Sequence, residues 1–363
     1  MGLAYDQIIA NFNVEGAIGK VEPFGNGLIN KSFRLHNKVT DAPDYLMQCV
    51  NDHVFPNIPA LTANLEQVTT HLRNKNCNKN AKNTCVIPVL TSSGNLVYEA
   101  KDKSYWRLFV FLKGCRSYER APNSRYVYQG ARAFGTFVRD MSDFPADRLH
   151  VVIPDFHNLK ARFEELRIAK PGAREARLTK CRGLLRSVEL QYSRVREMMS
   201  HIDKGDFPIR ITHNDTKFNN VLFKHNGEAA CVVDLDTTMP GIVHYDFGDG
   251  LRTGVVSCAE DEEDLPKVMI DEEKLEAYCY GFLEPLKDLL NPLETQFLSS
   301  AAMYMALIMS VRFLADYLND DRYYDIRYPE QNFVRVRCQL RLAELFYEKR
   351  GLIERLVSDV LDT

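Results

Sequence analysis

The sequence predicts an α+β fold in which a small N-terminal antiparallel sheet with one helix precedes a larger, mainly helical C-terminal lobe. Short apolar runs separated by Gly, Asn, Asp and Lys clusters fill residues 21–112, as is typical of antiparallel strands. From about residue 120 the pattern becomes helical, and only one pair of β-prone runs interrupts it. With 363 residues the chain is long enough for two compact units, each with its own core.

The N-terminal region contains short apolar runs that we expect to pair as strands. These runs are Phe33–Leu35, Tyr45–Val50, Val86–Leu90, Leu96–Glu99 and Tyr105–Leu112. A helix interrupts them, because Leu61, Leu65, Val68 and Leu72 share one helical face and Pro59 stands near its start.

A Gly-rich turn lies between two strands near the N-terminus. Gly25 and Gly27 would let backbone amides approach phosphates closely, and Asn26, Asn30 and Ser32 can add side-chain donors. An ordinary hairpin turn explains these residues equally well. No helix follows at once and no Gly-x-x-x-x-Gly-Lys-Ser/Thr occurs, which argues against a dinucleotide-binding βαβ unit and a P-loop. We expect a flap that binds a nucleotide.

The segment from Phe111 to Cys115 connects the sheet region to the helical region. If it is a hinge, the backbone at Phe111 and Leu112 can hydrogen-bond an adenine edge, since ligand sites favour such interdomain positions. A plain connecting loop is the alternative. The expected division is therefore a nucleotide-binding lobe over 1–112, a hinge over 113–116 and a helical lobe over 117–363.

The helical region holds the most hydrophobic segment of the chain. Helices are expected over 126–139, 175–201, 272–290 and 334–361, with an apolar helix near residue 300. That apolar segment runs for about fifteen residues and ends at Arg312. A membrane span needs about twenty apolar residues, so we expect a buried helix and no membrane association.

Charge and cysteine content exclude several classes of partner. A net charge of -3 and a pI near 6.3 are not those of a strongly basic protein, which argues against nucleic acid as a partner. The nine cysteines form no Cys-x-x-Cys pair and indicate reduced thiols in a reducing compartment. The N-terminus lacks a basic region followed by an apolar run, so we expect a cytoplasmic protein.

The pattern His213-x-Asp215-x-Lys217-x-x-Asn220 is the most informative in the chain. It is typical of the loop that transfers a phosphoryl group from ATP, in which an Asp positions the acceptor hydroxyl and an Asn five residues later binds Mg²⁺. Asp215 is therefore the candidate catalytic residue and Asn220 a candidate metal ligand. A solvated turn capped by Asp215 is the alternative.

A predicted hairpin follows this loop, because two β-prone runs flank the turn signal Asn226-Gly227. A two-residue loop would place Asn220 opposite Val233, whereas a three-residue loop with a Gly bulge would place it opposite Asp234 on the same face. We favour the second register. An amide oxygen and a carboxylate that converge suit Mg²⁺, with nucleotide phosphates and water completing its shell.

Asp246-Phe247-Gly248 spells the metal-binding triplet of protein kinases. It does not close the hairpin, and Asp234 does, so we reject Asp246 as the metal ligand. Asp246 is expected to cap a helix or turn, and an orienting role near the substrate stays open.

Together these features resemble the small-molecule kinases of the aminoglycoside phosphotransferase and choline kinase superfamily, which share a two-lobed protein-kinase-like fold. Within it, the sequence is most similar to the bacterial N-acetylhexosamine 1-kinases, over almost the whole chain. The segments that carry this likeness are His213–Lys217, Val233–Gly241, Tyr245–Asp249 and Val311–Leu318.

The resemblance implies ATP and Mg²⁺ as cofactors and the anomeric hydroxyl of N-acetylglucosamine or N-acetylgalactosamine as acceptor. It implies that Asp215 is the catalytic base and that Asn220 and Asp234 bind the metal. Asp236 is expected either to contact the metal through water or to bind the sugar.

The resemblance also places Arg312 and Tyr323 at the sugar. Arg312 stands out without it, because a buried guanidinium at the end of an apolar helix needs a partner. A structural ion pair with Asp316 is the alternative.

One departure concerns the basic residue that kinases of this fold usually carry on the third strand. This chain has Gln48 and Cys49 there. Glu66 on the following helix, which a strand Lys would pair with, is then only a solvated charge. Lys217 or Lys31 is expected to supply the missing positive charge.

Two alternatives to a sugar kinase stay open. One is a kinase of an amino alcohol or aminoglycoside, such as choline or homoserine, which would favour an acidic or aromatic pocket. The other is a nucleotide-binding scaffold without catalysis. The sequence does not indicate an oligomeric state.

Overall fold

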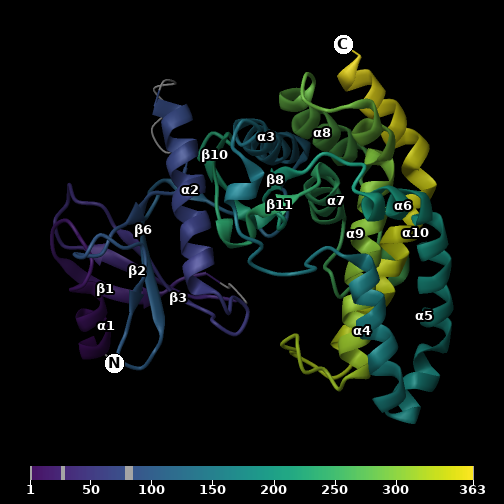
Figure 1. Cartoon of the computed structure of the whole chain (residues 1–363), viewed down its shortest axis with the longest axis horizontal. Helices are drawn as coiled ribbons and strands as arrows, with labels where there is room; N and C mark the ends of the chain where they lie inside the picture. The colour runs from purple at the N-terminus through teal and green to yellow at the C-terminus, as the bar shows by residue number, and fades with distance from the viewer. Residues whose placement is uncertain (1, 26–28, 78–84, 363) are drawn as a thin grey trace. The chain divides into compact units, whose positions relative to one another are not determined.

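The computed structural model describes residues 2–25, 29–77 and 85–362 (Figure 1). It contains two compact units, neither of which is continuous in sequence. Unit 1 comprises Met1–Ser117, Asp140–Pro154 and Val221–Pro240, and unit 2 comprises Tyr118–Arg139, Asp155–Asn220 and Gly241–Thr363. Unit 1 therefore includes the hairpin that follows the catalytic loop in sequence. The hinge expected at 113–116 stays a prediction.

Unit 1 is built on the predicted antiparallel sheet. Its strands follow the order β1-β2-β3-β6-β4, and β5 also pairs with β6. The strands are β1 (Ile18–Pro23), β2 (Lys31–Asn37), β3 (Tyr45–Val50), β4 (Pro88–Val89), β5 (Tyr98–Glu99) and β6 (Tyr105–Val110). All pairings are antiparallel, so the predicted arrangement is confirmed.

The two faces of this sheet carry different residues. Tyr45, Met47 and Leu108 belong to a buried apolar cluster that also includes residues of α1 (Gly2–Ile9). Gln48 pairs with Arg107 across β3 and β6. Because side chains alternate along a strand, these two polar residues point to the opposite face.

The helix of unit 1 is α2 (Ile58–Cys77). The four residues predicted to share one helical face are all buried: Leu61, Leu65, Val68 and Leu72. The predicted amphipathic helix is therefore confirmed.

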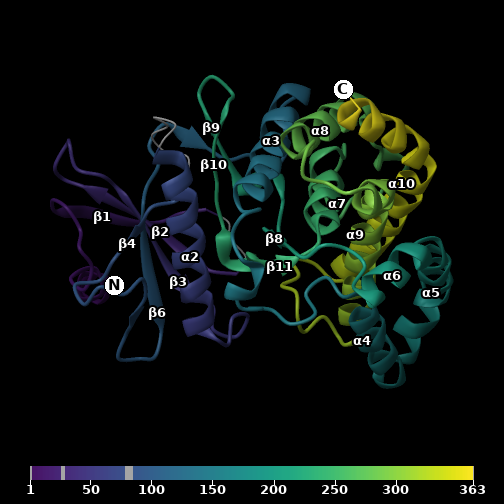
Figure 2. The same ribbon diagram turned by 45° about the horizontal axis from the view of Figure 1, so that its top comes forward.

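The predicted hairpin is β9 (Val221–Lys224) and β10 (Ala229–Val232), and β7 (Cys115–Arg116) pairs with β9 (Figure 2 shows this hairpin). The Lys224 amide donates to the Glu228 carbonyl (2.9 Å) across a turn in which Gly227 has φ +84°. The register then shifts after Ala229, so Val221 pairs with Val232. The favoured register, with Asn220 opposite Asp234, needs Val221 opposite Val233. That prediction is wrong, because the turn sets Lys224 opposite Glu228 and the shift after Ala229 moves the later pairs only one residue towards the favoured register, which leaves Val221 opposite Val232.

Unit 2 is mainly helical. Its helices are α3 (Ser124–Asp140), α4 (Leu159–Gly172), α5 (Glu175–Arg194), α6 (Arg196–Lys204), α7 (Val243–Gly254), α8 (Glu272–Leu283), α9 (Pro292–Leu318) and α10 (Gln331–Leu361). Short strands β8 (Arg210–Thr212) and β11 (Met239–Gly241) flank the hairpin in sequence. The 3₁₀ turns of unit 2 are η2 (Phe218–Asn220), η4 (Leu265–Lys267) and η5 (Glu284–Leu286), whereas η1 (Ala146–Arg148) and η3 (Leu235–Thr237) belong to unit 1. The predicted α+β fold is confirmed.

The apolar segment near residue 300 is α9. A capping box between Asn291 and Glu294 defines its start, with Pro292 in the first turn. By length and composition α9 could cross a membrane, yet 83% of its most apolar window is buried. It packs against α10, α7 and α4. The prediction of a buried helix is confirmed.

Candidate active site

The predicted catalytic loop begins directly after β8 in unit 2. Asn214 adopts a left-handed conformation with φ +63°, which turns the chain sharply. Its side-chain amide donates to the Thr212 carbonyl (3.2 Å), and the Thr212 hydroxyl donates to Asn214 Oδ1 (3.0 Å). Asn tolerates this conformation because its short polar side chain bonds locally. The turn sets the direction in which the Asp215 side chain points away from the backbone.

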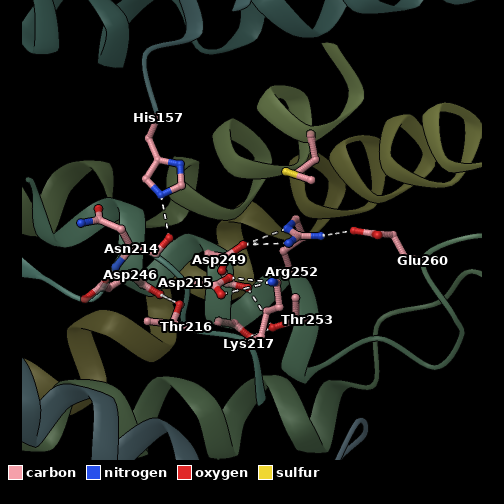
Figure 3. A network of polar contacts seen from close by, with 12 residues as sticks. His157, Asn214, Asp215, Thr216, Lys217, Asp246, Asp249, Arg252, Thr253 and Glu260 are labelled. Carbon is pink, nitrogen blue, oxygen red and sulfur yellow. Dashed lines mark hydrogen bonds and ion pairs between the residues drawn. The ribbon is translucent and has the colours of Figure 1, made fainter. Parts of the chain in front are cut away.

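The structure brings together Asp215, Lys217 and Asn220 (Figure 3 shows the first two). Lys217 Nζ lies 2.8 Å from Asp215 Oδ1, and Asn220 Nδ2 donates to Asp215 Oδ2 (3.1 Å) and to its carbonyl (2.8 Å). Burial opposes ionisation of Asp215, but the Lys217 ammonium, His213 and the Asn220 hydrogen bond keep its pKa below the usual range. The carboxylate is therefore charged at neutral pH and can accept a hydroxyl proton.

Asn220 uses its amide nitrogen for Asp215. In the part of the chain that the structure describes, no hydrogen bond uses its Oδ1. This oxygen is the kind of ligand that a hard cation prefers. The metal-binding role of Asn220 stays a prediction.

Asp246 holds the backbone of the catalytic loop. It lies in the first turn of α7, and its carboxylate accepts hydrogen bonds from the amides of His213 (2.8 Å) and Asn214 (2.7 Å). Its carbonyl accepts from the Thr216 hydroxyl (2.8 Å; Figure 3). Burial raises the pKa of Asp246 to about 6. The sequence pointed to Asp246 through the Asp-Phe-Gly triplet, but this positioning role was not predicted.

His157 supports the same loop from the segment before α4, and no motif in the sequence singles it out. Its Nε2 donates to the Asn214 carbonyl (2.9 Å), and its own carbonyl accepts from the Tyr304 hydroxyl (2.8 Å). Burial lowers the pKa of His157 to about 4, so the imidazole is neutral at physiological pH. Figure 3 shows the ring beside the loop.

This buried imidazole predicts a pH dependence of stability. Unfolded His157 binds a proton below its usual pKa of 6.5, whereas folded His157 does so only near 4. The stability that His157 contributes to the folded protein is therefore present above pH 6.5 and is lost as the pH falls towards 4. The free energy of unfolding of the wild type should fall by about 2–3 kcal/mol relative to His157→Gln between pH 7 and 4.5. The pKa of Asp246 is shifted in the opposite direction, but this shift is present in both proteins and cancels in the difference between their free energies of unfolding.

Urea unfolding at several pH values measures this difference. If the free energies of unfolding of the two proteins differed by the same amount over the whole pH range, the prediction would be contradicted.

A buried ion pair joins Arg252 and Asp249 on α7. Arg252 donates to Asp249 Oδ1 from Nη2 (2.8 Å) and Nε (3.1 Å), and to Glu260 Oε1 from Nη1 (3.0 Å; Figure 3). Glu260 is therefore anchored to α7.

In unit 1, Asp236 lies in a buried polar network with residues of the sheet. Arg107 donates to Asp236 Oδ1 from Nη1 (2.5 Å) and to Oδ2 from Nη2 (2.8 Å). Asn30 Nδ2 also donates to Oδ2 (2.7 Å). A carboxylate has about four acceptor sites, so one remains for a metal-bound water or a hydroxyl. The metal and sugar roles of Asp236 stay predictions.

Two residues expected in the nucleotide flap belong to this network. Asn30 Oδ1 accepts from the Asn51 amide (3.0 Å), and Ser32 accepts from Gln48 Nε2 (3.1 Å). Gly25 has φ +76°, which favours glycine. The two further flap candidates, Asn26 and Gly27, lie outside the described residues.

The expected adenine contacts lie beside the sheet. The Phe111 amide donates to the Asp44 carbonyl (2.8 Å), so that donor is occupied. The Arg34 guanidinium lies 4.2 Å from the centre of the Phe111 ring. Leu112 is buried with Ala230 and neighbouring apolar residues. Nucleotide binding by Phe111 and Leu112 stays a prediction.

Asp234 lies two residues after the end of β10 and has φ +60°. Among the residues that the structure describes, no three or more His, Cys, Asp or Glu side chains form a metal cluster. The expected Mg²⁺ site needs only one amide and one carboxylate from the protein, since phosphates and water complete it. It stays a prediction.

Arg312, the candidate sugar-binding residue, lies on α9 and is surrounded by aromatic rings from other segments. Its guanidinium carbon is 5.4, 5.9 and 5.6 Å from the ring centres of Phe156, Tyr323 and Tyr324. Burial opposes its charge, but the two tyrosines raise the pKa of Arg312. Over the described ranges it forms no ion pair, so it remains available for a polar ligand.

Asp316 does not pair with Arg312, although the sequence left that pairing open. Its carboxylate accepts from the amides of Tyr323 (2.8 Å) and Tyr324 (3.0 Å) and from Asn332 Nδ2 (2.9 Å). Asp316 therefore fixes the loop that places Tyr323 near Arg312.

Comparison with known proteins gives the family of the chain and supports its fold. Residues 20–281 match the phosphotransferase enzyme family. An aminoglycoside phosphotransferase from Alicyclobacillus acidocaldarius has a TM-score of 0.61 and 16% identity, covering 96% of this chain and 94% of that one. Amicoumacin kinase in complex with AMP-PNP and Ca²⁺ has a TM-score of 0.63 and 10% identity, covering 94% and 93%.

Choline kinase from Cryptosporidium parvum has a TM-score of 0.56 and 15% identity, covering 100% of this chain and 99% of that one. At these identities the solved structures show the fold, which is kinase-like as predicted. The narrower likeness to N-acetylhexosamine 1-kinases stays a prediction.

Proposed function

The chain belongs to the phosphotransferase enzyme family, and on that premise we propose that it transfers the γ-phosphoryl group of ATP to a sugar hydroxyl. The acceptor that we propose is the anomeric hydroxyl of N-acetylglucosamine or N-acetylgalactosamine. The observation that carries the proposal is the charged, partly buried Asp215 carboxylate, fixed by Lys217 and Asn220.

In this reaction the acceptor oxygen forms a bond to the γ-phosphorus. The bond between that phosphorus and the oxygen bridging the β- and γ-phosphates breaks, and ADP leaves. Asp215 orients the hydroxyl and receives its proton. Because the transition state is loose, the proton moves late and a carboxylate of low pKa suffices. Lys217 keeps Asp215 ionised and holds it in one orientation.

We propose Asn220 Oδ1 and Asp234 as protein ligands of Mg²⁺, with Asp236 contacting it through water. When bound, the metal would neutralise charge on the phosphates. Gly25, Asn30 and Ser32 are proposed to line the nucleotide site, with the backbone near Phe111 and Leu112. The amicoumacin kinase complex with AMP-PNP and Ca²⁺ supports a nucleotide and a divalent cation in this fold.

The surroundings of Arg312 favour a neutral acceptor. The rings of Phe156, Tyr323 and Tyr324 surround the protein's own guanidinium, whereas an ammonium acceptor would use such rings for itself. A cationic choline or aminoglycoside would meet a like charge there. Arg312 can instead donate to sugar hydroxyl or acetamide oxygens.

Substitution of Arg312 tests this role. Arg312→Met keeps the length of the side chain and removes its donors, so we expect the KM for the sugar to rise about 10-fold or more, with the KM for ATP unchanged. Arg335→Met is a matched control, since Arg335 also lies over an aromatic ring, that of Phe313. Equal sugar KM values for the wild type and Arg312→Met would exclude Arg312 from the acceptor site.

The acceptor class is tested by ADP release from Mg·ATP with N-acetylglucosamine, N-acetylgalactosamine, glucose, galactose, choline and homoserine. Turnover restricted to N-acetylated sugars supports the proposal. Turnover restricted to choline or homoserine would replace it with an amino-alcohol kinase. ATP binding without turnover on any acceptor would favour a nucleotide-binding scaffold.

A further inference from the structure

The third strand of the sheet has no basic residue at Gln48, but its neighbour β6 does. Arg107 is the partner of Gln48 in the ladder. It donates to Gln48 Oε1 from Nε (3.0 Å) and Nη2 (2.8 Å), which orients the guanidinium plane. On the outer edge of that plane, Nη1 and Nη2 each donate a hydrogen bond to the Asp236 carboxylate (2.5 and 2.8 Å). Only 4% of the Arg107 side chain and 3% of the Asp236 side chain are exposed.

This contact ties one short turn to several parts of the sheet. Asp236 lies in η3, and Arg107 binds it from β6. Asn30, which precedes β2, donates to the same carboxylate and is itself held by the Asn51 amide after β3. On the far side of the turn, Asn64 of α2 donates to the Thr238 carbonyl (3.2 Å). The turn is therefore held at Asp236 and at Thr238, two residues apart.

Asp234 is the first residue of this turn, and its φ of +60° is unfavourable for a residue with a Cβ. Such a conformation persists only where the surrounding contacts fix it. Burial opposes the charge of Arg107, but Asp236 and, more weakly, Asp234 raise its pKa. Arg107 thus acts electrostatically on both carboxylates of the Asp-Leu-Asp segment.

We propose that Arg107 replaces the missing strand base as a positioning residue: by its bidentate contact with Asp236 it fixes the turn that orients Asp234. The metal part of this inference rests on the proposed function, because it takes Asp234 as a Mg²⁺ ligand. Arg107 itself need not touch phosphate, since Gln48 and Asp236 occupy most of its donors.

Arg107→Lys is the informative variant. Lysine keeps the charge but cannot make two parallel hydrogen bonds to a carboxylate. Arg210→Lys is the matched control, because Arg210 makes an equivalent contact with Glu294 in unit 2, at 2.6 Å from Nε and 2.7 Å from Nη2. Both variants remove one buried bidentate pair, and only the first changes the turn.

Two measurements separate positioning from general stabilisation. The first is amide hydrogen exchange over residues 233–240 without any ligand, which should be about 10-fold faster in Arg107→Lys and unchanged in Arg210→Lys. The second is the Mg²⁺ concentration that gives half-maximal binding of a fluorescent ATP analogue, which should rise about 10-fold in Arg107→Lys alone. The thermal midpoint should fall in both variants.

Unchanged exchange over 233–240 in Arg107→Lys would overturn the positioning role, and an unchanged Mg²⁺ requirement would overturn its link to the metal. If the wild type binds no Mg·ATP analogue, the proposed function and the metal link both fail, while the exchange comparison still decides whether Arg107 fixes the turn. If Arg107→Lys does not fold, Gln48→Met gives the same readouts with a smaller shift, because it removes the orienting oxygen and leaves the ion pair.

Discussion

Replacement of Asp215 by asparagine is expected to lower the acceptor-dependent turnover of ATP by about 10²–10⁴-fold while nucleotide binding persists. The amide has nearly the same shape as the carboxylate, but it cannot receive the hydroxyl proton. It also lacks the charge that pairs with Lys217 at 2.8 Å. Loss of rate with little change in the KM for ATP identifies a group that acts on the acceptor during transfer.

Asp206→Asn is the matched control for this variant. Asp206 pairs with His201 (2.8 Å) in a partly exposed ion pair outside the catalytic loop. We expect its turnover to equal that of the wild type. Near-normal turnover by Asp215→Asn, measured on protein with a wild-type thermal midpoint, would contradict the assignment of Asp215.

The second large effect is expected at Asp246, although it touches no reactant in the proposed mechanism. Its two carboxylate oxygens accept from the amides of His213 and Asn214. In Asp246→Asn one oxygen remains, and the new NH₂ group faces the second amide. A buried donor is then left unsatisfied, which costs about 1–3 kcal/mol of stability. We expect kcat to fall about 10–100-fold, because small displacements of a catalytic group are costly.

Asp271→Asn provides the comparison. Asp271 also accepts from a backbone amide, that of Lys274 (3.1 Å), at the start of α8. Asparagine is an equally good cap at such a position, so this variant should retain stability and activity. A kcat for Asp246→Asn within two-fold of the wild type would show that the catalytic loop does not depend on α7. Steady-state kinetics and urea unfolding give both quantities.

Local sequence signals predicted the elements of this fold well. Short apolar runs predicted β3 and β6, and one-face spacing from Leu61 to Leu72 predicted α2. The apolar segment of α9 was correctly expected to be buried. These predictions succeed because each depends on the period of the chain over a few residues.

Contacts between distant residues could not be predicted in this way. Arg107 and Asp236 are 129 residues apart, and no local pattern within β6 distinguishes Arg107 from a surface arginine. The predicted register of the hairpin was wrong because it depends on which residues form the turn and on the irregularity after Ala229, and the signal Asn226-Gly227 specifies neither. Asp246 was noticed through its triplet, but its contacts with a loop about 30 residues earlier are visible only in the structure.

The most direct test of the account is transfer of phosphorus from [γ-³²P]ATP to N-acetylglucosamine, resolved from free phosphate, by the wild type and by Asp215→Asn. We expect a labelled sugar phosphate from the wild type and at least about 100-fold less from the variant. Equal labelling by the two proteins, or label released only as inorganic phosphate, would contradict it.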